Sequence, residues 1–119
     1  KKELIAGANK NISFTKYALK NLDIASFNNE KDNNVTDSNK AQLKDDLEMI
    51  QSENTKMMKA LQGDSPANII NGEFINEIDN INEYLDFIFE RVIQFDDICR
   101  NAHIKYFNGD VNKYDNIFN

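Results

Sequence analysis

Apolar residues recur at alternating steps of three and four along the second half of the chain. A helix brings such positions onto one face, because it has about 3.6 residues per turn. The pattern predicts one long helix over about residues 72–108, whose apolar face must pack against other helices. That face consists of Phe74, Ile78, Ile81, Leu85, Ile88, Val92, Phe95, Cys99, Ala102 and Tyr106.

Two further helices with the same stepping precede the long one. The first is predicted over residues 2–27, with Gly7 as a weak point. The second follows Asp37 or Ser38, either of which can cap it, and ends before Gly63. Their apolar faces consist of Ile5, Ala8, Ile12, Thr15, Leu19 and Leu22 in the first helix, and of Leu43, Leu47, Ile50, Met57 and Leu61 in the second.

Asn54 occupies a position of the second helix where the pattern requires an apolar side chain. A buried amide there would fix the register of the helices at some cost in stability. An amide at the edge of the apolar face would instead be hydrated. We favour the hydrated edge and expect no particular role for Asn54.

The segments between the predicted helices carry the residues that end or restart a helix. Residues 28–37 are polar and predict a solvated loop. Pro66 suits the first turn of a helix, and Gly72 permits a break, so the number of helices is three or four. Gly109 ends the long helix. The tail, residues 110–119, is expected to dock as a short helix, with a frayed terminus as the alternative.

Helical periodicity throughout, without convincing strand alternation, predicts an all-α fold. A length of 119 residues fits one domain, an antiparallel three- to four-helix bundle with the long C-terminal helix at its centre. The net charge of −6 disfavours nucleic acid and anionic membranes as partners, because their phosphates would repel the chain. No stretch approaches the roughly 20 apolar residues of a membrane span.

One cysteine permits no internal disulfide and excludes zinc or iron–sulfur sites built from four cysteines. The chain begins with Lys1 rather than methionine, so we expect that an N-terminal segment has been removed. A cleaved signal peptide would explain this, and so would trimming. The compartment stays open, with a slight preference for an exported protein.

The middle of the long helix is apolar on more than one face. Phe87, Phe89 and Ile93 lie off the main apolar face. A helix that is apolar all round is normally buried, which would make it the central element, covered on two sides. Alternatively, these three side chains form an exposed patch that binds a partner.

Catalytic and metal-binding patterns are largely absent. Di-iron bundles need Glu-x-x-His pairs on two helices, whereas this chain has one histidine and no such pair. We therefore interpret its many carboxylates as a solvated surface. No serine–histidine–aspartate order or glycine-rich phosphate loop is present. Cys99 and His103 form a potential thiol–imidazole pair, but a cysteine on an apolar helix face would have a raised pKa and poor access.

Cys99 and His103 also lie four residues apart, so a helix places them on one face, where both can reach a metal or a ring. The run Cys99-x-x-Ala102-His103-x-x-Tyr106 resembles the C-terminal helix of the cytochrome c′ and cytochrome b562 four-helix bundles. The resemblance implies haem binding with His103 as an axial ligand. It covers about a dozen residues, and Ala102 replaces the second cysteine that attaches haem in the c-type members.

The first predicted helix also lacks the methionine that is the second haem ligand in the b-type members, since all three methionines lie in the second helix. Packing explains Cys99 and His103 equally simply, with Cys99 as a small apolar residue of the core and His103 at its edge.

The sequence therefore favours a non-enzymatic helical interaction module without a cofactor. It would bind a protein partner, or a second copy of itself, through Phe87, Phe89 and Ile93. The alternative is a haem-binding or electron-transfer bundle that uses His103 and Cys99.

Overall fold

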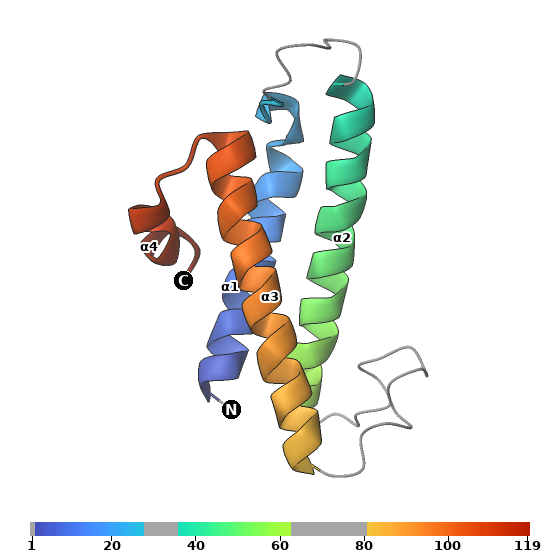
Figure 1. Cartoon of the computed structure of the whole chain (residues 1–119), viewed down its shortest axis with the longest axis vertical. Helices are drawn as coiled ribbons and strands as arrows, with labels where there is room; N and C mark the ends of the chain where they lie inside the picture. The colour runs from blue at the N-terminus through green and yellow to red at the C-terminus, as the bar shows by residue number, and fades with distance from the viewer. Residues whose placement is uncertain (1, 28–35, 63–80) are drawn as a thin grey trace.

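A computed structural model describes residues 2–27, 36–62 and 81–119, and all regular elements in these ranges are helical. Three long helices run up, down and up along the molecule (Figure 1), so consecutive helices are antiparallel. The long helices are α1 (Lys2–Lys20), α2 (Thr36–Leu61) and α3 (Ile81–Phe107), and the short elements are η1 (Leu22–Ile24), η5 (Val111–Lys113) and α4 (Tyr114–Phe118). The predicted all-α bundle with a long C-terminal helix is confirmed.

The boundaries of the first two helices differ from those predicted. α1 ends at Lys20, because the Asn21 side-chain amide donates to the Tyr17 carbonyl at 2.8 Å and the short helix η1 then begins. α2 already begins at Thr36, so the expectation that Asp37 or Ser38 caps it from outside was wrong.

Several expected boundaries lie outside the described residues. These are most of the polar loop at 28–37, the predicted helix boundaries at Gly63, Pro66 and Gly72, and the part of the long helix before Ile81.

Asn108, rather than Gly109, has the left-handed backbone that ends α3, with φ of 53°. An asparagine tolerates this conformation better than most residues. Gly109 is required for a different reason. Its N–H donates to the His103 carbonyl at 3.0 Å, and a Cβ at this position would lie 2.1 Å from the His103 ring. The glycine therefore permits the chain to turn back across that ring.

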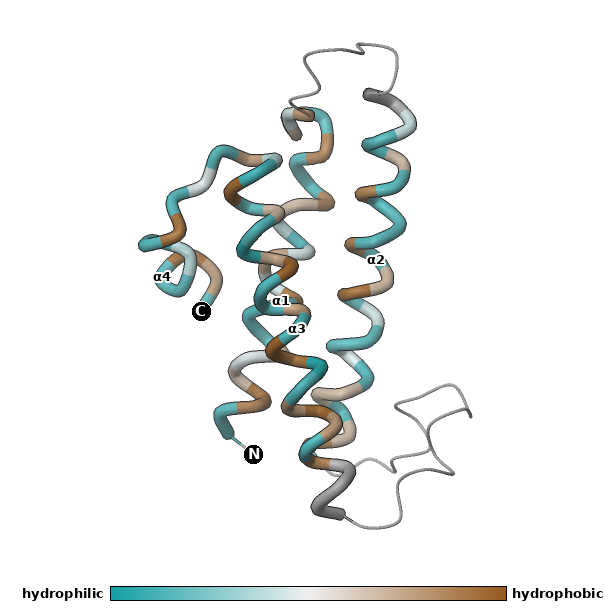
Figure 2. The backbone as a smooth tube through the Cα atoms, viewed as in Figure 1, coloured by the Kyte–Doolittle hydropathy of each residue, from teal (hydrophilic) through white to brown (hydrophobic). Residues whose placement is uncertain are grey.

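The core lies where α1 meets its neighbours, and α1 packs against α2, α3 and α4 (Figure 1). Apolar stretches recur along all three long helices (Figure 2), as the predicted periodicity requires. The buried apolar residues include Ala8, Ile12, Phe14 and Ala18 of α1, Leu43, Leu47, Ile50 and Met57 of α2, and Ile88, Val92, Phe95, Cys99 and Ala102 of α3. Since α1 contacts all the other helices, it shares the central position expected for the long helix alone.

Gly7 is a close-packing position rather than a weak point of α1. A Cβ on Gly7 would lie 2.9 Å from Val92 Cγ1. The missing side chain therefore brings the backbone of α1 against α3, and the helix continues through the glycine without a break.

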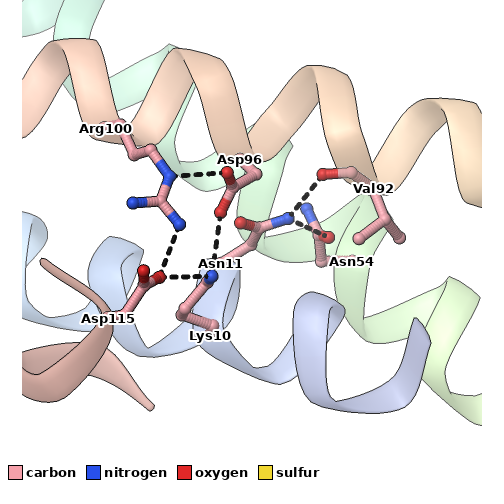
Figure 3. Close-up of polar contacts among 7 residues, drawn as sticks. All are labelled: Lys10, Asn11, Asn54, Val92, Asp96, Arg100 and Asp115. Carbon is pink, nitrogen blue, oxygen red and sulfur yellow. Dashed lines mark hydrogen bonds and ion pairs between the residues drawn. The ribbon is translucent and has the colours of Figure 1, made fainter. Parts of the chain in front are cut away.

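A buried amide cluster joins the three long helices near their middle (Figure 3). Asn11 of α1 donates to Asn54 Oδ1 of α2 at 3.0 Å and to the Val92 carbonyl of α3 at 3.2 Å. Asn54 donates to the Ile50 carbonyl at 2.7 Å. Both asparagines are fully buried. The expected hydrated edge for Asn54 was wrong, because Asn11 gives its amide a partner inside the core.

Replacing either asparagine leaves the other without its partner in an apolar surrounding. We expect Asn11→Ala and Asn54→Ala each to lower the free energy of unfolding by about 1–3 kcal/mol. The double variant should cost less than the sum, with a coupling energy of about 1 kcal/mol. Urea denaturation measures the free energies of unfolding of the two single variants and of the double variant. The exposed Asn101→Ala is the control, and simple additivity would show that the pair does not act as a unit.

Candidate functional site

Phe89 and Ile93, two residues of the predicted patch, lie exposed on α3. Phe89 is 52% exposed and Ile93 is 45% exposed, one turn apart on the same face. Phe87, the third residue, is partly buried and packs against the core. The expectation that α3 is covered on two sides is therefore wrong for Phe89 and Ile93, although it describes Phe87.

Phe89 and Ile93 line a shallow groove between α1 and α3, which we name the α1–α3 groove. Its volume is about 440 Å³. Leu4, Gly7 and Val92 line it with them, and Glu3, Lys10 and Asp96 add charged groups. Gly7 lets the backbone of α1 approach α3 beside the two exposed side chains. The groove thus combines exposed apolar side chains with charged groups.

His103 lies in the core and not at its edge. Its side chain is 5% exposed. Its ring centroid lies 5.2 Å from that of Phe118, 5.6 Å from Tyr114, 6.0 Å from Phe14 and 6.1 Å from Tyr17. Its Nδ1 is buried without a hydrogen-bond partner in the described part of the chain. Burial lowers the pKa of His103, because the apolar surrounding disfavours the charged ring.

Cys99 is also buried, at 1% exposure. Burial, and secondarily the negative charge of Asp96, raises the pKa of the thiol to about 12. The Tyr114 hydroxyl lies near this thiol and has no hydrogen-bond partner among the described residues. Its own pKa is raised, mainly by burial. A thiol in this state is a poor nucleophile and a poor metal ligand.

The C-terminal helix α4 docks against α1 and α3, as expected for the tail. Tyr114 and Phe118 are buried, and Phe118 meets Phe14 edge-on at 5.3 Å between ring centroids. The Arg100 guanidinium lies over the Tyr114 ring, 4.6 Å from its centroid. Aromatic packing and a cation over an aromatic face therefore hold the helix in place.

A cluster of four charged side chains ties α4 to the bundle (Figure 3). Asp115 of α4 pairs with Lys10 of α1 at 2.8 Å and with Arg100 of α3. Asp96 lies 3.2 Å from Lys10 and accepts a hydrogen bond from Arg100 at 2.7 Å. Lys10 and Arg100 hold the pKa of Asp115 near 2, well below its usual range. The hydrogen bond to Asp96 raises the pKa of Arg100.

The packing around His103 does not fit a haem ligand in this conformation. Aromatic side chains from α1 and α4 surround the ring, and Gly109 lies against it. Because these groups occupy the space that a planar macrocycle would need, α4 would have to leave before His103 reached an iron. Haem ligation therefore stays a prediction, and it requires that α4 first move away from His103.

Sequence reasoning missed Lys10, Asn11 and Asp115. Asp96 and Arg100 are four residues apart on one helix, a spacing that signals an ion pair. Lys10 and Asp115 are 105 residues apart, and no local pattern connects them. Asn54 stood out as a polar residue at an apolar position of its helix, but Asn11 was not among the residues of the predicted apolar face, so the sequence did not identify it as the partner of Asn54.

Comparisons of the chain with protein-family models, curated proteins and solved structures found no match. Within the described residues, no helix combines the length and apolar character needed to cross a membrane. The same residues contain no cluster of three or more metal-ligating side chains drawn from histidine, cysteine, aspartate and glutamate. The candidate site therefore rests on the geometry of the bundle surface.

The pH dependence of stability should report the burial of His103. Its folded pKa lies below the unfolded value near 6.5, so the unfolded chain takes up the proton first as the pH falls. Stability should therefore fall as the pH drops below about 6.5, and level off below the folded pKa. Urea midpoints at about pH 7.5, 6 and 5 measure this. His103→Phe should make stability less dependent on pH, whereas the control substitution of the exposed Lys105, Lys105→Ala, should not. An equal dependence on pH in the wild type and both variants would contradict this role of His103.

Haemin titration tests whether α4 must leave before His103 can bind haem iron. We expect the wild-type protein to leave the Soret band of free haemin unshifted, because α4 covers His103. Tyr114→Ala with Phe118→Ala should release α4 and allow a shift that His103→Ala removes. A wild-type shift that depends on His103 would contradict this account, and an equal shift with and without His103 would rule out the ligand role.

Proposed function

We propose that this protein is a non-enzymatic helical interaction module that binds a protein partner through the α1–α3 groove. The observation that carries the proposal is the exposure of Phe89 and Ile93, one turn apart on a helix whose opposite face is buried. Large apolar groups on a rigid element lose little conformational entropy on binding, so they can act as anchors.

The surroundings of the two anchors support this function. Leu4 and Val92 extend the apolar surface beneath them, and Lys10 and Asp96 supply charges at the same groove. Apolar anchors surrounded by polar groups are typical of interfaces in which a few residues supply most of the binding energy. The proposed partner is either another protein or a second copy of this chain.

The state of Cys99 and His103 supports a non-enzymatic role. Catalysis by a thiol–imidazole pair requires a thiolate and an accessible imidazole. Cys99 has a pKa raised to about 12, and His103 is enclosed by aromatic rings. Both residues instead fill space in the core next to α4.

A pair of matched variants tests the proposal. Phe89→Ser with Ile93→Ser should reduce partner capture from a lysate of the source cells by about tenfold or more, since each lost anchor costs above about 1 kcal/mol. Ile104→Ser, which removes another apolar side chain with 43% exposure from α3, is the control and should leave capture unchanged. Circular dichroism checks that all variants remain folded.

Sedimentation velocity separates the two kinds of partner. A homo-oligomer that becomes monomeric in the double variant would indicate a second copy as the partner. A monomer that captures the same proteins before and after the double substitution would contradict the proposed surface.

A further inference from the structure

A second apolar groove runs between α2 and α3, and we name it the α2–α3 groove. Both helices pack on α1 but diverge from each other toward the end at which α3 finishes (Figure 1). The space between them has a volume of about 480 Å³. Leu43, Leu47 and Ile50 line it from α2, Ile98 and Ala102 line it from α3, and Phe14 of α1 lies at its floor.

Specific contacts bound this groove at its two ends. At one end, Arg91 of α3 pairs with Glu53 of α2 at 2.6 Å. At the other, the rings of Phe27 and Tyr106 lie 5.0 Å apart, and the Ser26 N–H donates to the Tyr106 carbonyl at 2.8 Å. Between them, the α2 wall extends from Asn39 to Ile50, which is about 16 Å or three helical turns.

The groove has an apolar wall and a polar rim of mixed charge. Ile98 is 49% exposed on the α3 side, next to the buried Cys99. Asp46 lies on the α2 rim and Lys105 on the α3 rim, with neutral Gln42 and Asn101 beside them. An occupant would therefore meet a negative charge on one side and a positive charge on the other.

A helix suits this groove better than an extended segment does. The walls are helices whose backbone groups are already paired, so they cannot supply the backbone hydrogen bonds that an added strand requires. A helix satisfies its own backbone and needs only an apolar face. It would also complete a four-helix arrangement, because α2 and α3 each have a side not covered by the other.

We propose that the α2–α3 groove binds an amphipathic helix of a protein partner, with apolar side chains against Ile98 and a basic side chain facing Asp46. The net charge of −6 favours a basic partner over a second copy, since two copies repel each other. This surface is distinct from the α1–α3 groove, and the proposal holds or fails independently of the proposed function.

Fluorescence can test the proposal directly, because the chain contains no tryptophan. Phe27→Trp places a single reporter at the end of the α2–α3 groove, and Phe89→Trp places one at the α1–α3 groove. The probe is a capped synthetic helix of about 18 residues made of leucine, alanine and lysine, long enough to be helical in water. Its leucines occupy one face and its lysines flank them. A scrambled peptide of equal composition controls for charge alone.

We expect a saturable emission change in the Phe27→Trp protein and none in the Phe89→Trp protein. Adding Ile98→Glu to the Phe27→Trp protein should weaken binding by at least about tenfold, because it places a carboxylate against the apolar face. Ile104→Glu is the matched control and should leave the affinity unchanged. Asp46→Lys should weaken binding of the lysine helix and strengthen binding of a glutamate version.

Four results would overturn the proposal. They are an absent response in the Phe27→Trp protein, a response also given by the scrambled peptide, equal weakening by Ile98→Glu and Ile104→Glu, and emission that depends on protein concentration without peptide. The last would indicate that a second copy fills the groove. A response confined to the Phe89→Trp protein would overturn this proposal and support the proposed function instead.

Discussion

The arrangement of the bundle depends on the Asn11 side chain, which donates hydrogen bonds to two helices at once. One bond reaches Asn54 of α2 and the other the Val92 carbonyl of α3. Apolar contacts alone allow helices to slide along each other, whereas a buried hydrogen bond holds only at one axial position. The amide of α1 therefore sets where both neighbours lie. Small residues on the same face, Ala8 and Ala18 among them, allow the close approach that the bonds require.

Because α1 packs against both α2 and α3, these two helices have little contact with each other. They meet at the ion pair between Arg91 and Glu53 and diverge beyond it, which leaves the α2–α3 groove open. On the other side, Gly7 draws α1 against Val92 and leaves Phe89 and Ile93 at the surface. Both apolar surfaces are thus consequences of one helix packing against two.

At the C-terminal end, α4 covers Cys99 and His103, two residues of reactive types, so that both become part of the packed core. Tyr114 covers the Cys99 thiol, and Phe118 lies against His103. Burial then raises the pKa of Cys99 and lowers that of His103, so both groups are neutral near pH 7. The surface cluster around Asp115 supplies the charge that the interior lacks, and it fixes the direction from which α4 approaches.

The amino-acid sequence by itself determined the helical class, the three long helices and most of the buried apolar positions of α2 and α3. It could do so because the 3.6-residue period is a local property, visible within each segment. The predicted face of α3 from Leu85 to Tyr106 is the one that packs inward. Phe89 and Ile93 were likewise identified from their place off that face, with burial and exposure left as alternatives.

Only the tertiary structure decided the burial of polar residues and the exposure of apolar ones. Asn54 was expected to be hydrated and His103 to lie at an edge, yet both are buried. Their partners, Asn11 for the amide and the rings of Phe14 and Phe118 for the imidazole, come from distant parts of the chain. The ion pair between Lys10 and Asp115 likewise spans almost the whole chain. Local periodicity reports which face of a helix is apolar, whereas burial depends on what the fold places against that face.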